Sequence, residues 1–266
     1  MEEKFGGIIG ELEEWKFVLR KNEKLLATRI GKRISELYID PLTAHQFVES
    51  LTKNKDSIHA FGLLQAISNT IEMRPLLSVR TGEFSEIEDE LVRRESQLLQ
   101  EIPDETEFEF DEFLKSLKTA LMFEAWIEES TEDQILTKFK VAPGEFYGRR
   151  EIADWLVYSI QELSLLLGYK EILKDIRKLR IRLQYGIREE LLPLIRLKQV
   201  GRIRARKLFN SGIKTLDALR KTPIERLSTI VGLAVAKNIG DQLEGKKELK
   251  KESQQNLKKF DGVAGI

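Results

Sequence analysis

The stretch Leu197-Lys-Gln-Val-Gly-Arg-Ile-Arg-Ala-Arg-Lys-Leu-Phe-Asn-Ser-Gly-Ile213 decides the fold expected for the C-terminal part of this chain. Gly201 allows the backbone to turn tightly and lets a ligand approach the main chain closely. Ala205 and Leu208, three residues apart, are expected to pack inward from the helix that follows the turn. Gly212 is expected to end that helix. The pattern predicts a helix-hairpin-helix.

Basic side chains surround the predicted turn. Arg202 and Arg206 lie four residues apart and are expected to share the outer face of the helix. The backbone amides that open a helix, together with the positive end of its dipole, bind phosphate. Such contacts recognise the nucleic-acid backbone and its shape rather than base sequence, and an ordinary helical turn on a basic surface is the alternative. The residues expected to contact nucleic acid here are Lys198, Gly201, Arg202, Arg204, Arg206 and Lys207.

A near-repeat of this segment follows 31 residues later. The glycine and the inward-facing residues of the first copy recur as Val231-Gly232, Ala236 and Ile239. The second copy has lost most of the charge of the first. We therefore expect it to be the structural partner in a pair of hairpins, within a domain over residues 196–245.

Charge is divided unevenly along the chain, although its formal net charge is zero. Residues 171–266 hold 23 Lys and Arg against 11 Asp and Glu, a net of +12, which leaves −12 on residues 1–170. The acidic residues concentrate between Glu83 and Asp133, where 18 carboxylates meet 4 basic residues. A basic half favours a polyanionic partner because neutralised phosphates release counterions, and a solvated surface without a partner is the alternative. For the acidic region, a solvated helix face is favoured over paired catalytic carboxylates.

Residues 1–40 contain the one convincing strand pattern of the sequence. A short helix around residues 8–16 is followed by two runs that flank an Asn22-Glu23 turn, Phe17–Lys21 and Lys24–Thr28. These runs predict a small hairpin. A helix followed by a two-stranded wing is the tail of a winged helix, so this segment is expected to form a partial one.

From Pro41 onward, apolar residues recur at helical spacing and predict a bundle over residues 41–195. Two runs expected to lie in the core are Phe110, Phe113, Leu114, Leu117 and Leu121, and Ile152, Leu156, Ile160, Leu163 and Leu167. Helix breaks are expected at Thr81-Gly82, Ile102-Pro103-Asp104, Ala142-Pro143-Gly144 and Gly168. The expected fold class is mainly α, and residues 246–266 form a basic tail expected to be flexible until bound.

Several chemistries are disfavoured by the residues present. The chain has no cysteine, and its two histidines, His45 and His59, have no companion cluster, so no metal site is expected. Gly240–Lys247 nearly spells a phosphate-binding loop, but Lys247 stands where a magnesium-binding hydroxyl is needed and no strand precedes it. No catalytic centre is recognised, and no apolar run is long enough to cross a membrane. A cytoplasmic location is expected.

The chain resembles archaeal helicases of the Hjm (Holliday junction migration) type, relatives of the human HELQ helicase. The resemblance covers nearly the whole chain in order, through the hairpin segment and Leu37–Ala44, Leu63–Pro75, Ala120–Ile127, Ala142–Glu145 and Tyr185–Leu192. It implies a DNA helicase of forks and junctions, in which two RecA-like domains hydrolyse ATP and drive 3′ to 5′ movement. This chain is expected to lack those motor domains and to be inactive alone. No cofactor is therefore expected in it, since ATP and Mg²⁺ would belong to the motor.

The resemblance also implies roles for individual residues. In the family the helical bundle, called the ratchet, closes around single-stranded DNA, and one of its helices stacks side chains on bases. That helix should carry Trp155, whose indole is expected to be free to stack; a tryptophan that only packs the bundle is the alternative. The family's partner arginine falls on Gly148, and Arg149 is the expected substitute with altered geometry. Arg149, Arg150 and Trp155 are thus expected DNA contacts.

The tail suggests a further partner. Gln254, Leu257 and Phe260 resemble a sliding-clamp (PCNA) binding box, although Asp261 stands where a second aromatic is usual, and a merely amphipathic tail is the alternative. The other expected partners are single-stranded and branched DNA at the nucleoid, and helicase motor domains in cis or in trans. The function expected is strand guiding within a helicase of fork repair and recombination. A clamp-recruited adaptor and an RNA-handling accessory module are the alternatives.

Overall fold

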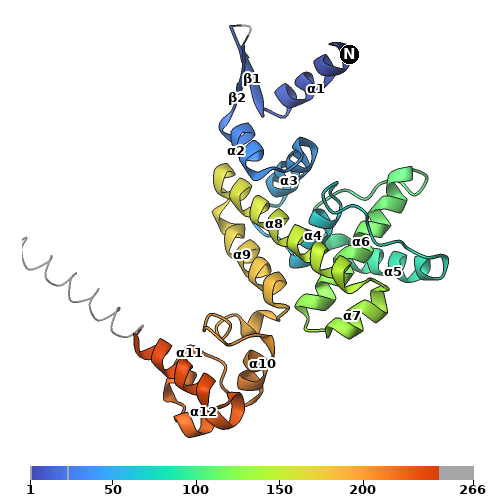
Figure 1. Cartoon of the computed structure of the whole chain (residues 1–266). Coiled ribbons are helices and arrows are strands. Elements are labelled where there is room, and N and C mark those ends of the chain that lie inside the picture. Colours follow the sequence, from blue (N-terminus) through green and yellow to red (C-terminus); the bar gives the residue numbers. More distant parts are fainter. Residues whose placement is uncertain (1, 23, 246–266) are drawn as a thin grey trace, which may run out of the picture. The chain divides into compact units, whose positions relative to one another are not determined.

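The chain folds mainly into helices, with one two-stranded sheet in the part that the structure describes (Figure 1). The structure is a computed structural model that describes residues 2–22 and 24–245, with side chains from residue 7 onward. It divides into two compact units, Met1–Gln184 and Tyr185–Ile266. The expected mainly α class with a small hairpin is confirmed. The finer division into four parts, with a boundary between residues 195 and 196, stays a prediction.

The first unit opens with a helix and a hairpin, as predicted. The bounds of these elements are α1 (Glu2–Glu14), β1 (Val18–Lys21), β2 (Lys24–Ala27) and α2 (Arg29–Leu37). The two strands pair in antiparallel register, with Leu19 opposite Leu26. The helix before the hairpin begins earlier than the predicted start near residue 8.

Local contacts fix the turn from the hairpin into α2. The Thr28 hydroxyl accepts a hydrogen bond from the Gly31 amide at 3.1 Å and donates one to the Lys16 carbonyl at 2.8 Å. It therefore caps the helix and ties its start to the base of β1. A side chain on Gly31 would collide with the carbonyl of Phe17, so only glycine lets α2 approach this backbone so closely.

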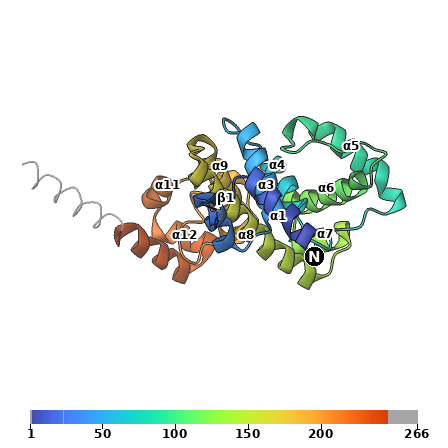
Figure 2. The ribbon, with the colours of Figure 1, turned by 90° about the horizontal axis from the view of Figure 1, so that it is seen from above.

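Seven further helices complete the first unit. Their bounds are α3 (Pro41–Lys53), α4 (Ala60–Ser68), α5 (Phe84–Arg94), α6 (Phe108–Ile127), α7 (Glu132–Phe139), α8 (Pro143–Leu167) and α9 (Lys170–Tyr185), with short 3-10 turns η1 (Thr81–Glu83) and η2 (Glu95–Gln97). α6 packs against α4, α5 and α7, and α8 packs against α2, α3 and α4 (Figures 1 and 2). The long helix α8 is thus the element that several others contact.

The predicted apolar stripes form the core of this unit. In α6, Phe113, Leu114 and Leu117 are buried, and in α8, Leu156 and Leu163 are buried. The predicted breaks also lie where helices begin or end, because each has a residue type that interrupts helical geometry. Pro143 occupies the first position of α8, and Gly168 ends it with a φ of +80°.

The second unit is a smaller helical cluster with its own core. Its elements are η3 (Glu189–Leu191), α10 (Arg202–Asn210), α11 (Leu216–Lys221), α12 (Ile224–Val231) and a further helical stretch over residues 233–245. α10 packs against α12 and η3. Ala205 and Leu208 point into the core, as predicted, and both are fully buried.

The end of α10 also agrees with its prediction. The Gly212 amide donates to the Phe209 carbonyl and the Ile213 amide donates to the Leu208 carbonyl, each at 3.0 Å. These two bonds satisfy the last carbonyls of the helix and require a left-handed residue between them, which Gly212 provides with a φ of +85°. The buried Ile213 and Leu208 add the apolar contact typical of this ending.

Candidate nucleic-acid interface

The start of α10 is open to solvent, but its glycine is not needed for the turn. Gly201 is the N-cap residue, with φ −83° and ψ −178°, which is extended backbone that any residue adopts. A Cβ added there would meet nothing within 4 Å. The expectation that Gly201 supplies special backbone freedom is therefore wrong. What the exposed glycine does provide is an unobstructed path to the amides that open the helix.

Three basic side chains in or next to α10 are exposed, two near its start and one in its last turn. These are Lys198, Arg204 and Lys207. Arg204 folds back and donates through Nη1 to the Gln199 carbonyl at 3.0 Å, which holds its guanidinium next to the turn. We call these three residues the hairpin cations. Lys198 and Arg204 add positive charge at the positive end of the α10 dipole, and Lys207 adds a third charge in the last turn of the helix.

Two other arginines of α10 are less available. Arg206 is half-buried, lies 5.1 Å from the centre of the Phe209 ring, and donates to Glu190 at 2.9 Å. Burial acts to raise the pKa of the Glu190 carboxyl, but the hydrogen bond from Arg206, a backbone hydrogen bond and the charges of Arg206 and Arg188 together lower it. Arg202 is also half-buried. Arg202 and Arg206, which were predicted to share the outer face of the helix, are therefore partly buried and partly used in contacts within the protein.

The second copy of the near-repeat has the same buried pattern as the first. Ala236 and Ile239 are fully buried, like their counterparts in α10. Gly232 has a φ of +88°, a value that favours glycine, whereas the matching Gly201 does not. The strict backbone requirement thus lies in the copy that has little charge. Sequence gave no signal for this difference, since both copies read Val-Gly.

Trp155 in α8 is anchored rather than free. Its Nε1 donates to the Leu37 carbonyl at 2.9 Å, and its half-buried ring packs against the core of the first unit. The expectation of a free indole is wrong, because the carbonyl at the end of α2 takes up the one donor of the ring. Stacking of a base on the exposed part of the ring stays a prediction.

Arg149 is a structural residue of the bundle. Its side chain is 10% exposed, and Nη2 donates to the Pro75 carbonyl at 2.6 Å. Nη1 lies 3.5 Å from a carboxylate oxygen of Glu145, one turn earlier in α8. A guanidinium held inside the bundle cannot reach a DNA strand, so the geometry does not support the predicted DNA contact by Arg149.

Arg150 is held in an aromatic clamp formed by Trp126, Phe146 and Tyr147. Its guanidinium carbon lies 4.2 Å from the centre of the Trp126 ring and 5.5 Å from the centres of the other two. Desolvation lowers the pKa of Arg150. Its Nη2 donates to the Gln184 carbonyl at 3.1 Å, next to a bond of 2.6 Å from Trp126 Nε1 to the Leu183 carbonyl.

The clamp therefore has a visible structural task. The last carbonyls of a helix have no partner within the helix. Trp126 and Arg150 satisfy two of them at the end of α9. This arrangement, which no sequence pattern indicated, uses both residues inside the first unit and leaves Arg150 a poor candidate for direct DNA contact.

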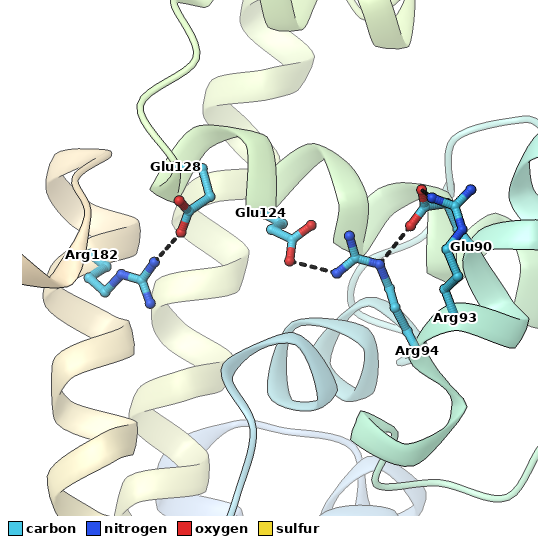
Figure 3. A network of polar contacts seen from close by, with 6 residues as sticks. All are labelled: Glu90, Arg93, Arg94, Glu124, Glu128 and Arg182. Carbon is cyan, nitrogen blue, oxygen red and sulfur yellow. Dashed lines mark hydrogen bonds and ion pairs between the residues drawn. The ribbon is translucent and has the colours of Figure 1, made fainter.

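Many of the acidic residues between Glu83 and Asp133 are engaged in ion pairs rather than merely solvated. Figure 3 shows Arg94 of α5 between Glu90 and Glu124, at 2.7 Å from each carboxylate. The same view shows Arg182 of α9 paired with Glu128 at 2.7 Å. These pairs connect α5 and α9 to α6. The expected solvated helix face is thus only part of their role.

The most perturbed of these carboxylates is Glu83. It accepts a hydrogen bond of 2.6 Å from Lys118, a lysine whose side chain is 6% exposed. That bond, followed by a second one from the Arg80 amide, lowers the pKa of Glu83 to about 2. Lys118 also donates to the Ser78 carbonyl at 2.8 Å, so two of its three N–H donors have partners. The pair is structural, since it holds η1 against α6.

Two predicted features fall partly or wholly outside the described residues. Gln254, Leu257 and Phe260, the predicted clamp-binding residues, lie outside them. Of the near phosphate-loop segment, residues 240–245 are helical, which a phosphate-binding loop is not. Within residues 2–22 and 24–245, no three His, Asp or Glu side chains gather to hold a metal ion. In the same residues, no helix has both the length and the apolar character required to span a membrane.

Comparison with known proteins identifies the bundle. Residues 61–186 match the family described as archaeal helicase, domain 4. The chain is 35% identical over 251 residues to the ATP-dependent DNA helicase Hel308 of Pyrococcus horikoshii, covering 91% of this chain and 34% of that protein. It is 38% identical over 236 residues to the Hel308 of Methanocella arvoryzae, covering 87% and 31%.

A third relative gives the same picture. The Hel308 of Methanocaldococcus jannaschii is 36% identical over 238 residues, which are 89% of this chain and 18% of that protein. The chain thus spans about a third or less of the length of these relatives. The predicted family is confirmed. This chain belongs to the Hel308 (Hjm) family of archaeal DNA helicases and corresponds to its C-terminal portion.

Proposed function

We propose that this chain binds and guides single-stranded and forked DNA as part of a 3′ to 5′ helicase that acts in fork repair and recombination. The observation that carries the proposal is the exposed start of α10, with Lys198 and Arg204 beside it and the third hairpin cation, Lys207, further along the same helix. The backbone amides at this helix start, the helix dipole and the nearby cations all favour a backbone phosphate as the ligand. The names of the relatives, ATP-dependent DNA helicases, support DNA as the polymer.

The proposal divides the work of the helicase. ATP and Mg²⁺ would be bound by motor domains, in cis or in trans, and this chain would hold the strand that they move. The α10 contacts would grip the backbone without reading bases, as a translocating enzyme requires. Trp155 would add a stacking surface whose orientation is fixed by its bond to Leu37. The place of action would be the cytoplasm, at the nucleoid.

The test is fluorescence-anisotropy titration of labelled single-stranded and forked DNA across a salt series. Wild type is compared with K198Q/R204Q/K207Q, and with a control, K21Q/K24Q/K55Q, that removes three exposed lysines elsewhere. Each phosphate contact to a single strand contributes roughly 0.7 to the slope of log K against log salt. The hairpin variant should therefore lose a slope of about 2, while the control keeps the wild-type slope.

Three further outcomes would separate this proposal from its alternatives. Equal affinity for RNA and DNA of the same sequence would favour an RNA-handling module. Absence of binding at low salt would contradict the DNA-guiding proposal. Binding to PCNA that is lost on deletion of residues 246–266 would then favour a clamp-recruited adaptor.

A further inference from the structure

One face of α9 presents cations that the protein itself does not use. Lys170, Lys174 and Arg177 are all exposed, and their side chains make no ion pair or hydrogen bond with any residue that the structure describes. Their spacing of four and three residues places them on one side of the helix. We call these three residues the α9 stripe.

The other basic residues of α9 behave differently. Arg180 forms a two-pronged pair with Asp154 at 2.9 and 3.0 Å, and Arg182 pairs with Glu128 at 2.7 Å. Lys178 pairs with Asp175 at 3.1 Å. The helix therefore neutralises the cations that serve its own packing and leaves those of the stripe unneutralised.

The direction of the stripe is fixed by burial. Ile172, Ile176, Leu179 and Leu183 are buried and hold α9 against the first unit. At 100° per residue, the three stripe residues lie opposite these four residues, and a fifth buried residue, Leu173, lies beside the stripe, about 40° from Arg177. Of the two acidic residues in α9, Asp175 is already paired, and Glu171 lies on the flank of the stripe. Six basic against two acidic residues leave the helix strongly positive.

The length of the stripe suits a nucleic-acid backbone. From Lys170 to Arg177 the helix rises by about 10 Å, at 1.5 Å per residue. Along one strand of duplex DNA the phosphates are spaced about 3.4 Å apart on the axis, so about three phosphates fall within this span. Three unpaired cations in a row match that repeat, and no aromatic residue stands among them to stack on bases.

We propose that the α9 stripe is a second phosphate-contact surface, which binds the DNA backbone independently of the start of α10. The proposal rests on the proposed function, since it takes DNA as the polymer. It adds a site in the first unit, made of Lys170, Lys174 and Arg177, that binds the DNA backbone through charge alone. Binding there would be insensitive to base sequence and steeply dependent on salt.

The test replaces the stripe with K170Q/K174Q/R177Q in the full chain, because glutamine preserves length and helix propensity while removing charge. The matched control is again K21Q/K24Q/K55Q. On single-stranded DNA the stripe variant should lose a slope of about 2 in the salt series, with weaker binding, unchanged far-UV circular dichroism and an unchanged Tm. A loss of slope on duplex DNA as well, of about 2.7 at roughly 0.9 per contact, identifies the backbone as the ligand.

A second readout uses the wild-type protein. Lysine-reactive footprinting should show Lys170 and Lys174 protected by saturating DNA, with Lys55 unprotected. A wild-type slope in the stripe variant, or stripe lysines that stay unprotected, overturns this inference. If the hairpin variant still loses slope in that case, the α10 contacts stand and only the stripe is wrong. If wild-type chain shows no salt-dependent binding at all, the proposed function fails together with the stripe.

Discussion

Replacement of Arg149 by methionine tests whether this arginine supports the bundle or touches DNA. The substitution keeps a long side chain but removes the donor to the Pro75 carbonyl, a part-buried bond of 2.6 Å. Hydrogen bonds that involve a charged group contribute about 1.5–3 kcal/mol. The pair with Glu145, whose side chain is 58% exposed, adds little.

The expected loss is therefore about 2 kcal/mol in the free energy of unfolding of the first unit. Part of this loss of stability is offset, because the substitution also removes Arg149 Nε, which is buried without a hydrogen-bond partner. All three tryptophans of the chain, Trp15, Trp126 and Trp155, lie in the first unit, so their fluorescence reports its unfolding in urea. With a urea slope of about 2 kcal/mol/M, the midpoint should fall by roughly 1 M.

The matched control is Arg204→Met on the exposed start of α10. There the same substitution should change stability by less than about 0.5 kcal/mol, because the side chain is exposed. It should, however, lower the salt slope of single-strand binding by about 0.7. A structural role for Arg149 would be contradicted if Arg149→Met kept its urea midpoint and instead lost salt slope.

Three other predictions concern Glu83, the glycines of α10 and Trp155. Because the folded-state pKa of Glu83 is lowered to about 2 by Lys118, its stabilising contribution is complete above the ordinary glutamate pKa of about 4.3 and is lost as pH falls toward 2. Urea unfolding should thus show wild type losing at most about 2 kcal/mol more than Glu83→Gln between pH 5 and pH 2.5, less where solvent screens the pair, and equal losses would contradict the pairing. Gly212→Ala should lower the Tm of the second unit, because a side chain in the left-handed backbone conformation costs about 1 kcal/mol. Gly201→Ala should leave the Tm unchanged, since its backbone is extended. Calorimetry that ranks the two variants the other way would contradict this interpretation. Trp155→Ala should weaken single-strand binding by about 1–3 kcal/mol. Trp155→Phe keeps a ring but loses the bond to Leu37, and it should retain most of the binding affinity. Equal binding by both variants would mean that Trp155 only packs the bundle.

The features that sequence predicted well are those set by neighbours in the chain. The apolar stripes of α6 and α8 are buried because helical periodicity alone decides which face is apolar. Pro143 and Gly168 bound α8 because their own backbone preferences interrupt a helix. The hairpin followed from two short strand-like runs on either side of the Asn22-Glu23 turn.

The features that sequence missed depend on partners far along the chain. Arg149 is buried by its bond to Pro75, 74 residues away, and Trp155 is anchored by Leu37, 118 residues away. No local pattern distinguishes such residues from exposed ones of the same type. The aromatic clamp around Arg150 and the unpaired α9 stripe were missed for the same reason, because pairing is decided by tertiary packing.

The most direct test of the account is the salt dependence of single-stranded DNA binding by wild type and by K198Q/R204Q/K207Q. We expect linear plots of log K against log salt, with the hairpin variant lower in slope by about 2 and the K21Q/K24Q/K55Q control unchanged. Identical slopes for the hairpin variant and the control would contradict it, since the exposed start of α10 would then make no phosphate contact.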